Sequence, residues 1–188
     1  YLRYDHRRHR WLLWQGHRWE QDCDYKIMNM ALNAARLRLR MAANLDDRGD
    51  RKRAANFALT SENRNRINSA LDIAKNLDPI ADVSPWDADL FLLACANGVV
   101  DLHTGTLRDG KPNDRVTLTT GMDYAPDADC PRWEQFLLEI FDGDADMVSF
   151  IQRALRYSLT GDTREQCLFL CWGGGANGKS TMLNIVRS

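Results

Sequence analysis

Gly173-Gly174-Gly175-Ala176-Asn177-Gly178-Lys179-Ser180-Thr181 is the stretch that decides the expected fold of the carboxyl-terminal part of this chain. Its first eight residues match G-x-x-x-x-G-K-[ST], the pattern of a P-loop. The residues before it, 167–172, are apolar and predict a buried parallel strand that turns into a helix at the glycines. This is the context in which the motif binds phosphate. The alternative is a glycine-rich turn that binds nothing.

Each residue type in this loop has its own role in holding a nucleotide. Glycines let the backbone N–H groups point at phosphate oxygens, and the following helix adds the positive end of its dipole. Lys179 is expected to contact the β- and γ-phosphates as the catalytic residue, and the Ser180 hydroxyl is expected to ligate Mg²⁺. The predicted nucleotide-binding residues are Gly173, Gly174, Gly175, Ala176, Asn177, Gly178, Lys179, Ser180 and Thr181.

Little sequence follows the loop, since only residues 182–188 remain. A P-loop ATPase also needs a carboxylate on a neighbouring strand, a residue that orients water and usually an arginine finger. The sequence therefore predicts a truncated α/β P-loop NTPase core. Because the chain also opens on Tyr1 rather than Met, we expect a fragment of a larger protein that is inactive by itself.

Composition is that of an ordinary globular chain, with 188 residues, 44% hydrophobic and 27% charged. No apolar run approaches 18 residues and no basic-then-apolar leader is present, so we expect no membrane partner and a cytoplasmic location. The cysteines are odd in number and scattered, which predicts buried reduced thiols rather than a disulfide framework. They are Cys23, Cys95, Cys130, Cys167 and Cys171.

Charge is distributed unevenly along the chain. Residues 1–75 hold 16 Lys and Arg against 9 Asp and Glu, whereas residues 76–188 hold 9 against 17. A basic half joined to an acidic half indicates either contact with a polyanion or packing of the two halves on each other. The candidate DNA-binding residues are Arg7, Arg8, Arg10 and Arg18. The tryptophans beside them resemble a base-stacking platform, but we favour a hairpin that buries one aromatic face.

Residues 1–130 are predicted to form an α+β module of helices and short β-hairpins. A hairpin over 10–19 precedes helices over 24–45, over 51–59 and from 61 to before 78, and a second hairpin over 90–102 precedes a strand over 115–119. The apolar stripe of the first helix is expected to be core. It contains Ile27, Met30, Ala31, Ala34, Leu37, Met41 and Leu45.

Residues 131–188 are predicted to form a second domain, the start of an ATPase. A helix begins at Pro131, where proline suits a first turn, and another carries an apolar face from Met147 to Ser158. These two helices lead into the P-loop strand. A small-molecule kinase is disfavoured because its P-loop would usually stand near the start of its domain.

Five segments along the chain form a joint pattern. They are Tyr4-Asp5 with Trp11 to Trp19, Asn97-Gly98-Val99-Val100-Asp101-Leu102 with Thr104-Gly105, Cys130-Pro131-Arg132-Trp133, Tyr157-Ser158-Leu159-Thr160-Gly161-Asp162, and Gly173 to Thr181. Together they resemble the phage and plasmid primase-helicases. In that family a poxvirus-primase-helicase-like amino-terminal domain precedes a superfamily 3 helicase core.

The resemblance implies an ATP-dependent DNA helicase that replicates a phage or plasmid-like element in a bacterial or phage-infected host cell. It implies ATP and Mg²⁺ as cofactors, DNA as a partner, a homo-hexameric ring and often an upstream primase domain. It assigns nucleotide and Mg²⁺ binding to Gly173, Gly178, Lys179, Ser180 and Thr181. The alternative is a non-catalytic module that serves assembly or DNA docking in a replication protein.

Overall fold

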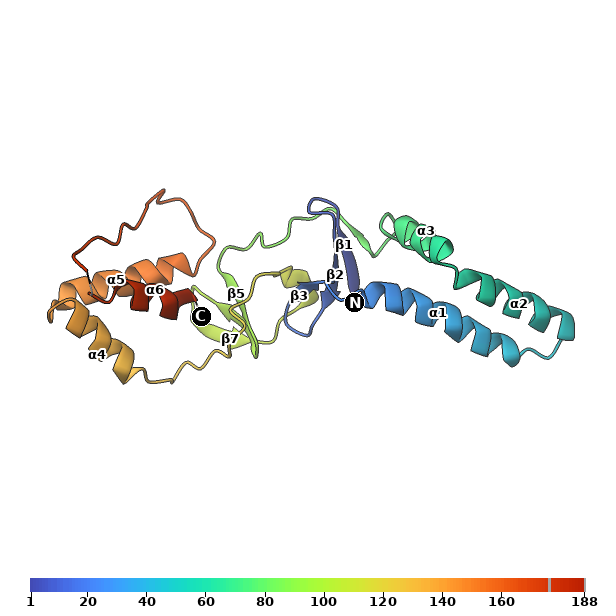
Figure 1. Ribbon diagram of the computed structural model, residues 1–188, viewed down its shortest axis with the longest axis horizontal. Coiled ribbons are helices and arrows are strands. Elements are labelled where there is room, and N and C mark those ends of the chain that lie inside the picture. The colour runs from blue at the N-terminus through green and yellow to red at the C-terminus, as the bar shows by residue number, and fades with distance from the viewer. Residues whose placement is uncertain (176, 188) are drawn as a thin grey trace. The chain divides into compact units, whose positions relative to one another are not determined.

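The structure, a computed structural model, describes residues 1–175 and 177–187. The chain divides into unit 1, comprising Tyr1–Asp87 with Lys111–Thr117, and unit 2, comprising Ala88–Gly110 with Leu118–Ser188. Each unit combines helices with a β-sheet (Figure 1), which confirms the predicted mixture of α and β structure. The predicted domain boundary at residue 130 stays a prediction.

Unit 1 contains a four-stranded sheet with the order β3-β2-β1-β4. Its strands are β1 (Leu2–Asp5), β2 (Arg10–Trp14), β3 (Trp19–Gln21) and β4 (Ala81–Asp82). β2 pairs antiparallel with both β1 and β3, whereas β4 pairs parallel with β1. The predicted hairpin over residues 10–19 is confirmed as β2 and β3. β1 and β4 are strands that the sequence analysis did not predict.

Trp19 forms the centre of the unit 1 core. It is 1% exposed and packs with the fully buried Leu12 and with Trp86. Its indole N–H donates to the carbonyl of Pro112 at 2.9 Å, and its backbone N–H donates to the carbonyl of Val116 at 2.9 Å. A buried indole needs such an acceptor, because an unpaired buried donor costs free energy. The favoured interpretation of a hairpin with one buried aromatic face is therefore right for Trp19.

Three helices separate β3 from β4 in the sequence. They are α1 (Lys26–Ala43), α2 (Arg48–Ser61) and α3 (Arg64–Ala74), and they confirm the three predicted helices. α1 and α2 run antiparallel as a helical hairpin (Figure 1). The Asp47 and Asn63 side chains accept backbone N–H groups in the first turns of α2 and α3. Such caps satisfy donors that have no partner inside the helix.

The apolar stripe of α1 is mostly exposed, so the prediction that it forms core is wrong. Ile27 is buried, but Met30, Leu37 and Met41 are 52%, 55% and 61% exposed. Helices in a two-helix hairpin each bury only the narrow face that meets the partner. Apart from Ile27, the buried positions of these two helices hold small residues: Ala35, Ala42 and Ala58. The larger side chains of the stripe remain outside that contact.

Unit 2 contains an antiparallel sheet with the order β5-β6-β7. Its strands are β5 (Leu92–Cys95), β6 (Gly98–Asp101) and β7 (Thr106–Arg108), which confirms the predicted hairpin. At Gly98 an added Cβ would lie 2.6 Å from the Arg108 carbonyl oxygen, so glycine is needed for this approach of the two strands.

The predicted strand over 115–119 is wrong. Pro112–Asp114 form a 3-10 turn, η1, and Arg115 adopts a left-handed backbone with φ of 55°. A left-handed residue breaks an extended run. Thr119 makes an isolated bridge to Ala94 instead.

The helices of unit 2 are α4 (Pro131–Ile140), α5 (Ala145–Ser158) and α6 (Lys179–Arg187). Pro131 occupies the first turn of α4, where its missing N–H costs nothing. Leu137 of α4 is fully buried and Met182 of α6 is 6% exposed. The two predicted helices that lead toward the P-loop are therefore confirmed.

Candidate functional site

The segment before the P-loop is not a strand, so the prediction of a strand over residues 167–172 is wrong. Leu168, Leu170 and Trp172 are 89%, 81% and 89% exposed. A strand of a parallel sheet is stabilised by hydrogen bonds at its edges and by burial of both faces. Among residues 1–175 and 177–187, no strand pairs with this segment. A complete P-loop core is therefore not observed.

Lys179 begins α6, and its ammonium turns back over the loop. Its Nζ donates to the carbonyl of Gly173 at 3.1 Å, to the carbonyl of Gly174 at 3.0 Å and to Oδ1 of Asn177 at 2.5 Å. An ammonium has three N–H donors, so these acceptors can use all of them. A phosphate that bound here would replace one or more of these acceptors.

Gly178 joins the loop to α6 and packs against α4. Its φ is +79°, and an added Cβ would lie 2.5 Å from Cγ2 of Ile140. Both facts require glycine at this position. Ser180 and Thr181 lie in the first turn of α6 with exposed side chains. Ala176, the remaining residue of the predicted site, lies outside the described residues.

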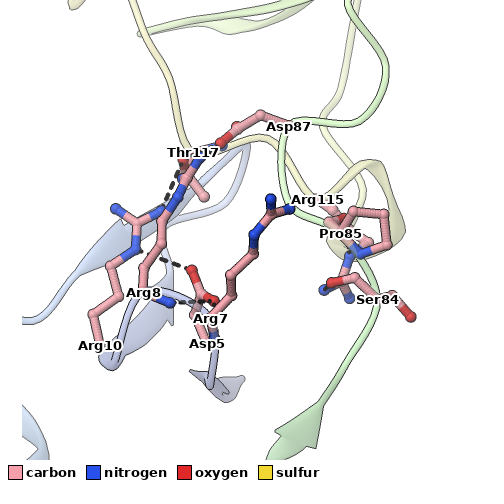
Figure 2. Close-up of polar contacts among 9 residues, drawn as sticks. All are labelled: Asp5, Arg7, Arg8, Arg10, Ser84, Pro85, Asp87, Arg115 and Thr117. Carbon is pink, nitrogen blue, oxygen red and sulfur yellow. Dashed lines mark hydrogen bonds and ion pairs between the residues drawn. The ribbon is translucent and has the colours of Figure 1, made fainter.

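The arginines predicted to contact DNA lie in unit 1, and carboxylates hold three of them. The ion pairs join Arg8 with Asp87, Arg10 with Asp5, and Arg18 with Glu20, at N–O distances of 3.2 to 3.3 Å. Figure 2 shows the side chains of Arg8 and Arg10 reaching toward Asp87 and Thr117. A paired arginine keeps donors for a second acceptor, but its charge is partly balanced within the fold.

Asp5 organises the turn between β1 and β2. Its side chain is buried, and Oδ1 accepts the backbone N–H groups of Arg7 and Arg8 at 3.1 Å each, while Oδ2 accepts Nε of Arg10 at 3.3 Å. A buried carboxylate requires partners of this kind. Arg7 itself is exposed. In the described ranges, no hydrogen bond or ion pair holds its guanidinium.

Asp82 at the end of β4 is the second anchored carboxylate. Nε of Arg3 lies 3.7 Å from its Oδ2, and the Arg115 guanidinium donates to the same oxygen. Burial by itself would raise the pKa of Asp82, but the hydrogen bonds from Arg115 and from the Ser84 backbone outweigh it and hold the pKa below its ordinary value. Arg115 also donates to the carbonyls of Ser84 at 2.6 Å and Pro85 at 2.9 Å (Figure 2).

These side chains border an open hollow of about 520 Å³ in unit 1, called here the arginine hollow, with walls formed by residues 5–8 and residues 82–86. Trp86 belongs to its lining, and the indole N–H of Trp86 is buried without an acceptor. The Arg115 guanidinium lies 3.9 Å from the centre of the Trp86 ring. Asp5, Asp82 and Arg115 at this hollow were not predicted as site residues from the sequence.

A family comparison covers most of this structure. Residues 1–142 match the family described as D5 N terminal like. The chain belongs to the D5 N-terminal-like family. The match includes all of unit 1, the strands β5 to β7 and the helix α4, and it ends before α5 and the P-loop. Membership in the D5 N-terminal-like family confirms the predicted resemblance to the amino-terminal region of primase-helicases.

A relative of this D5 N-terminal-like chain occurs in Acanthamoeba polyphaga mimivirus, where it carries the name "Putative helicase L207/L206". The two are 26% identical over 199 residues, which cover 94% of this chain and 20% of the mimivirus protein. The chain thus spans about a fifth of the length of this relative. The printed name of this relative is that of a helicase.

The sequence also predicted that the chain has no membrane-spanning helix. Within the described part, none of the helices is long and apolar enough to cross a membrane.

The prediction of buried cysteines is right for Cys95 and wrong for the others, which are exposed: Cys23, Cys130, Cys167 and Cys171. These four lie in connecting segments, and only Cys95 stands in a strand of a packed sheet. Free cysteine is buried where its segment reaches a core.

Proposed function

We propose that this chain is part of an ATP-dependent DNA helicase that acts in replication of a phage or plasmid-like element. The observation that carries the proposal is the P-loop motif with Lys179 at the start of α6, in the same chain as a D5 N-terminal-like region. The name of the mimivirus relative supports it. ATP and Mg²⁺ are the proposed cofactors.

In this proposal Lys179 exchanges its loop acceptors for phosphate oxygens of ATP. The carbonyls of Gly173 and Gly174 and the amide of Asn177 hold the ammonium near the loop, so little movement is needed. A charged hydrogen bond to phosphate typically contributes about 1.5–3 kcal/mol. The exposed Ser180 hydroxyl ligates Mg²⁺. Residues 173–181 together form the nucleotide site.

The partners and setting follow from the same proposal. DNA is the substrate, the parent protein forms a homo-hexamer in the cytoplasm, and a primase domain precedes this region. Because the chain covers 20% of its mimivirus relative, the other parts of an ATPase core are assigned to the rest of a longer protein. These parts are the Mg²⁺-holding carboxylate, the water-orienting residue and the arginine finger.

The test is a Lys179→Ala substitution in a longer natural chain that carries the complete core. ATP turnover should fall at least about 100-fold, because the phosphates lose their principal cation. Lys52→Ala on the exposed surface of α2 is the matched control and should leave turnover unchanged. Circular dichroism verifies folding. Near-normal turnover in folded Lys179→Ala protein would exclude the P-loop assignment.

A second candidate is a non-catalytic module for assembly or DNA docking. The exposed apolar stripe of α1 favours it, because contiguous exposed apolar surface often marks an interaction site. If the longer chain lacks ATPase activity altogether, with wild-type Lys179 and intact folding, this second candidate replaces the first.

A further inference from the structure

The arginine hollow has a cationic character. Five arginines lie in or beside it, against three carboxylates. The arginines are Arg3, Arg7, Arg8, Arg10 and Arg115, and the carboxylates are Asp5, Asp82 and Asp87. Each of these carboxylates is paired with an arginine. Because the arginines outnumber the carboxylates, the net charge of the group is positive. An excess of guanidinium groups around an open hollow attracts anions.

Arg7 is the residue that the fold leaves available. Asp5 fixes its backbone through the N–H at 3.1 Å, so the side chain starts from a defined position. Its exposed guanidinium carries no hydrogen bond or ion pair anywhere in residues 1–175 and 177–187. A guanidinium presents a planar fork of donors that matches the oxygens of a phosphate. Arg7 can therefore bind an anion without first breaking an internal contact.

Trp86 supplies an independent observation at the same hollow. The residue is 9% exposed, and its indole N–H is buried without any acceptor in the described structure. Tryptophan is a donor only, and a buried donor without a partner destabilises the fold. An acceptor that enters the hollow and reaches this N–H would remove that cost. Both Arg7 and Trp86 thus favour a ligand rich in acceptor oxygens.

Neither Trp86 nor Trp19 presents a free ring face on which a base could stack. Trp86 is almost fully buried, and Arg115 covers its ring at 3.9 Å from the centre. Trp19, which packs on Trp86, is 1% exposed. What the arginines and tryptophans offer to a ligand is therefore hydrogen-bond donors and charge rather than indole faces. Contacts of this kind recognise phosphate and carry no base-sequence information.

We propose that the arginine hollow binds a phosphate group, with Arg7 as the charged donor and the Trp86 indole N–H as the neutral donor. A phosphodiester of single-stranded DNA is the expected source. That choice of source rests on the proposed helicase function, whereas the phosphate site rests on unit 1 alone. A free nucleotide has the same phosphate chemistry, so the experiment separates the two.

The experiment measures fluorescence anisotropy of a labelled oligothymidylate with the full 188-residue chain across a salt series. Every protein carries Lys179→Ala, so that binding at the P-loop does not contribute. Arg7→Gln should weaken binding at low salt about tenfold, as expected for a charged hydrogen bond, and should lower the salt slope by about 0.7. Arg48→Gln, an exposed arginine of α2 outside the hollow, should change affinity less than twofold.

The Trp86→Phe substitution removes the neutral indole N–H donor and keeps the charged Arg7 donor, so it measures the contribution of the neutral donor alone. It should weaken binding about threefold with an unchanged salt slope, because no phosphate charge is left unneutralised. Circular dichroism checks its fold, since Trp86 also packs in the core. If Trp86→Phe does not fold, the Arg7→Gln result decides by itself.

A parallel series with labelled ATP identifies the source. Arg7-dependent binding of the oligonucleotide but not of ATP supports the proposal in full. Arg7-dependent binding of ATP alone keeps the phosphate site and overturns the DNA source. Equal effects of Arg7→Gln and Arg48→Gln, or no binding of either probe at low salt, overturn the proposal. None of these outcomes depends on catalysis at Lys179.

Discussion

Two irregular segments of this chain differ sharply in how they are held. Residues 83–87 of unit 1 have no regular structure after β4, yet Trp86 is buried and Arg115 donates to the carbonyls of Ser84 and Pro85. Residues 167–172 of unit 2 are more apolar in sequence, yet Trp172 is 89% exposed. The first segment receives partners from residues about 30 positions away.

The difference shows that the apolar content of a segment does not by itself determine whether the segment is buried. A polar segment becomes ordered when remote side chains satisfy its carbonyls, as Arg115 does. An apolar segment that predicts a strand still requires other strands for its edges and packed layers for its faces. The loop residues that would perform chemistry can be present in the sequence while the sheet that positions them is not observed.

The largest expected difference concerns two tryptophans, one from each side of the comparison. Trp19→Ala should lower the free energy of unfolding of unit 1 by about 3–5 kcal/mol, because it empties a packed core site. Trp172→Ala should change stability by less than about 0.5 kcal/mol, because the side chain is already exposed. Urea unfolding followed by circular dichroism measures both. Comparable losses from the two substitutions would remove the distinction.

Thiol chemistry tests the same contrast without mutation. Cys167 and Cys171 are exposed, whereas Cys95 is 5% exposed in β5. Labelling with a thiol reagent should modify Cys95 about 10²–10³-fold more slowly than the other two, because it must wait for opening of the sheet. Mass spectrometry of peptides resolves the rates. Equal rates would show that the segment over residues 167–172 is as protected as the strands.

A smaller effect is expected at Asp82, which binds Arg115 and so helps to hold the segment over residues 83–87. Asp82→Asn should cost about 1–3 kcal/mol at neutral pH through loss of charged hydrogen bonds. Asp50→Asn, at an exposed ion pair on α2, should cost less than about 1 kcal/mol.

The pH dependence of this substitution follows from the lowered pKa of Asp82. The folded pKa lies below the unfolded value of about 3.9, so the stabilisation is complete above that value and disappears as pH falls through the folded pKa. Wild type and Asp82→Asn should therefore converge in stability at acidic pH. A difference that persists or grows there would contradict the assignment.

Local pattern predicted the helices and hairpins well. Helical periodicity identified α1 to α5, and the turn at Asn97-Gly98 identified the β5–β6 hairpin, because short-range contacts decide such elements. The pattern did not show that Met30 and Leu37 would be exposed, since periodicity reports an apolar face but not whether a neighbour covers it.

The two candidate sites differ in the same way in how far the sequence predicts them. The P-loop residues are contiguous, so Lys179 and Gly178 could be named from the motif, although their role in binding ATP remains a proposal. The arginine hollow contains Asp5 and Asp82, and Arg115 pairs with Asp82 beside it; these residues meet only after folding. Arg7 was named from local charge. Nothing in the local sequence distinguished it from its paired neighbours Arg8 and Arg10.

We propose that the nucleotide site needs neighbouring strands, and none is observed beside residues 167–172 in the described residues. Steady-state ATPase assays, with and without DNA, should compare this 188-residue chain with a longer natural chain that contains the whole core. The short chain should show no measurable turnover and the longer one DNA-stimulated turnover, since an arginine finger alone typically supplies about 10³–10⁵ in rate. Comparable turnover by the two chains would contradict the account.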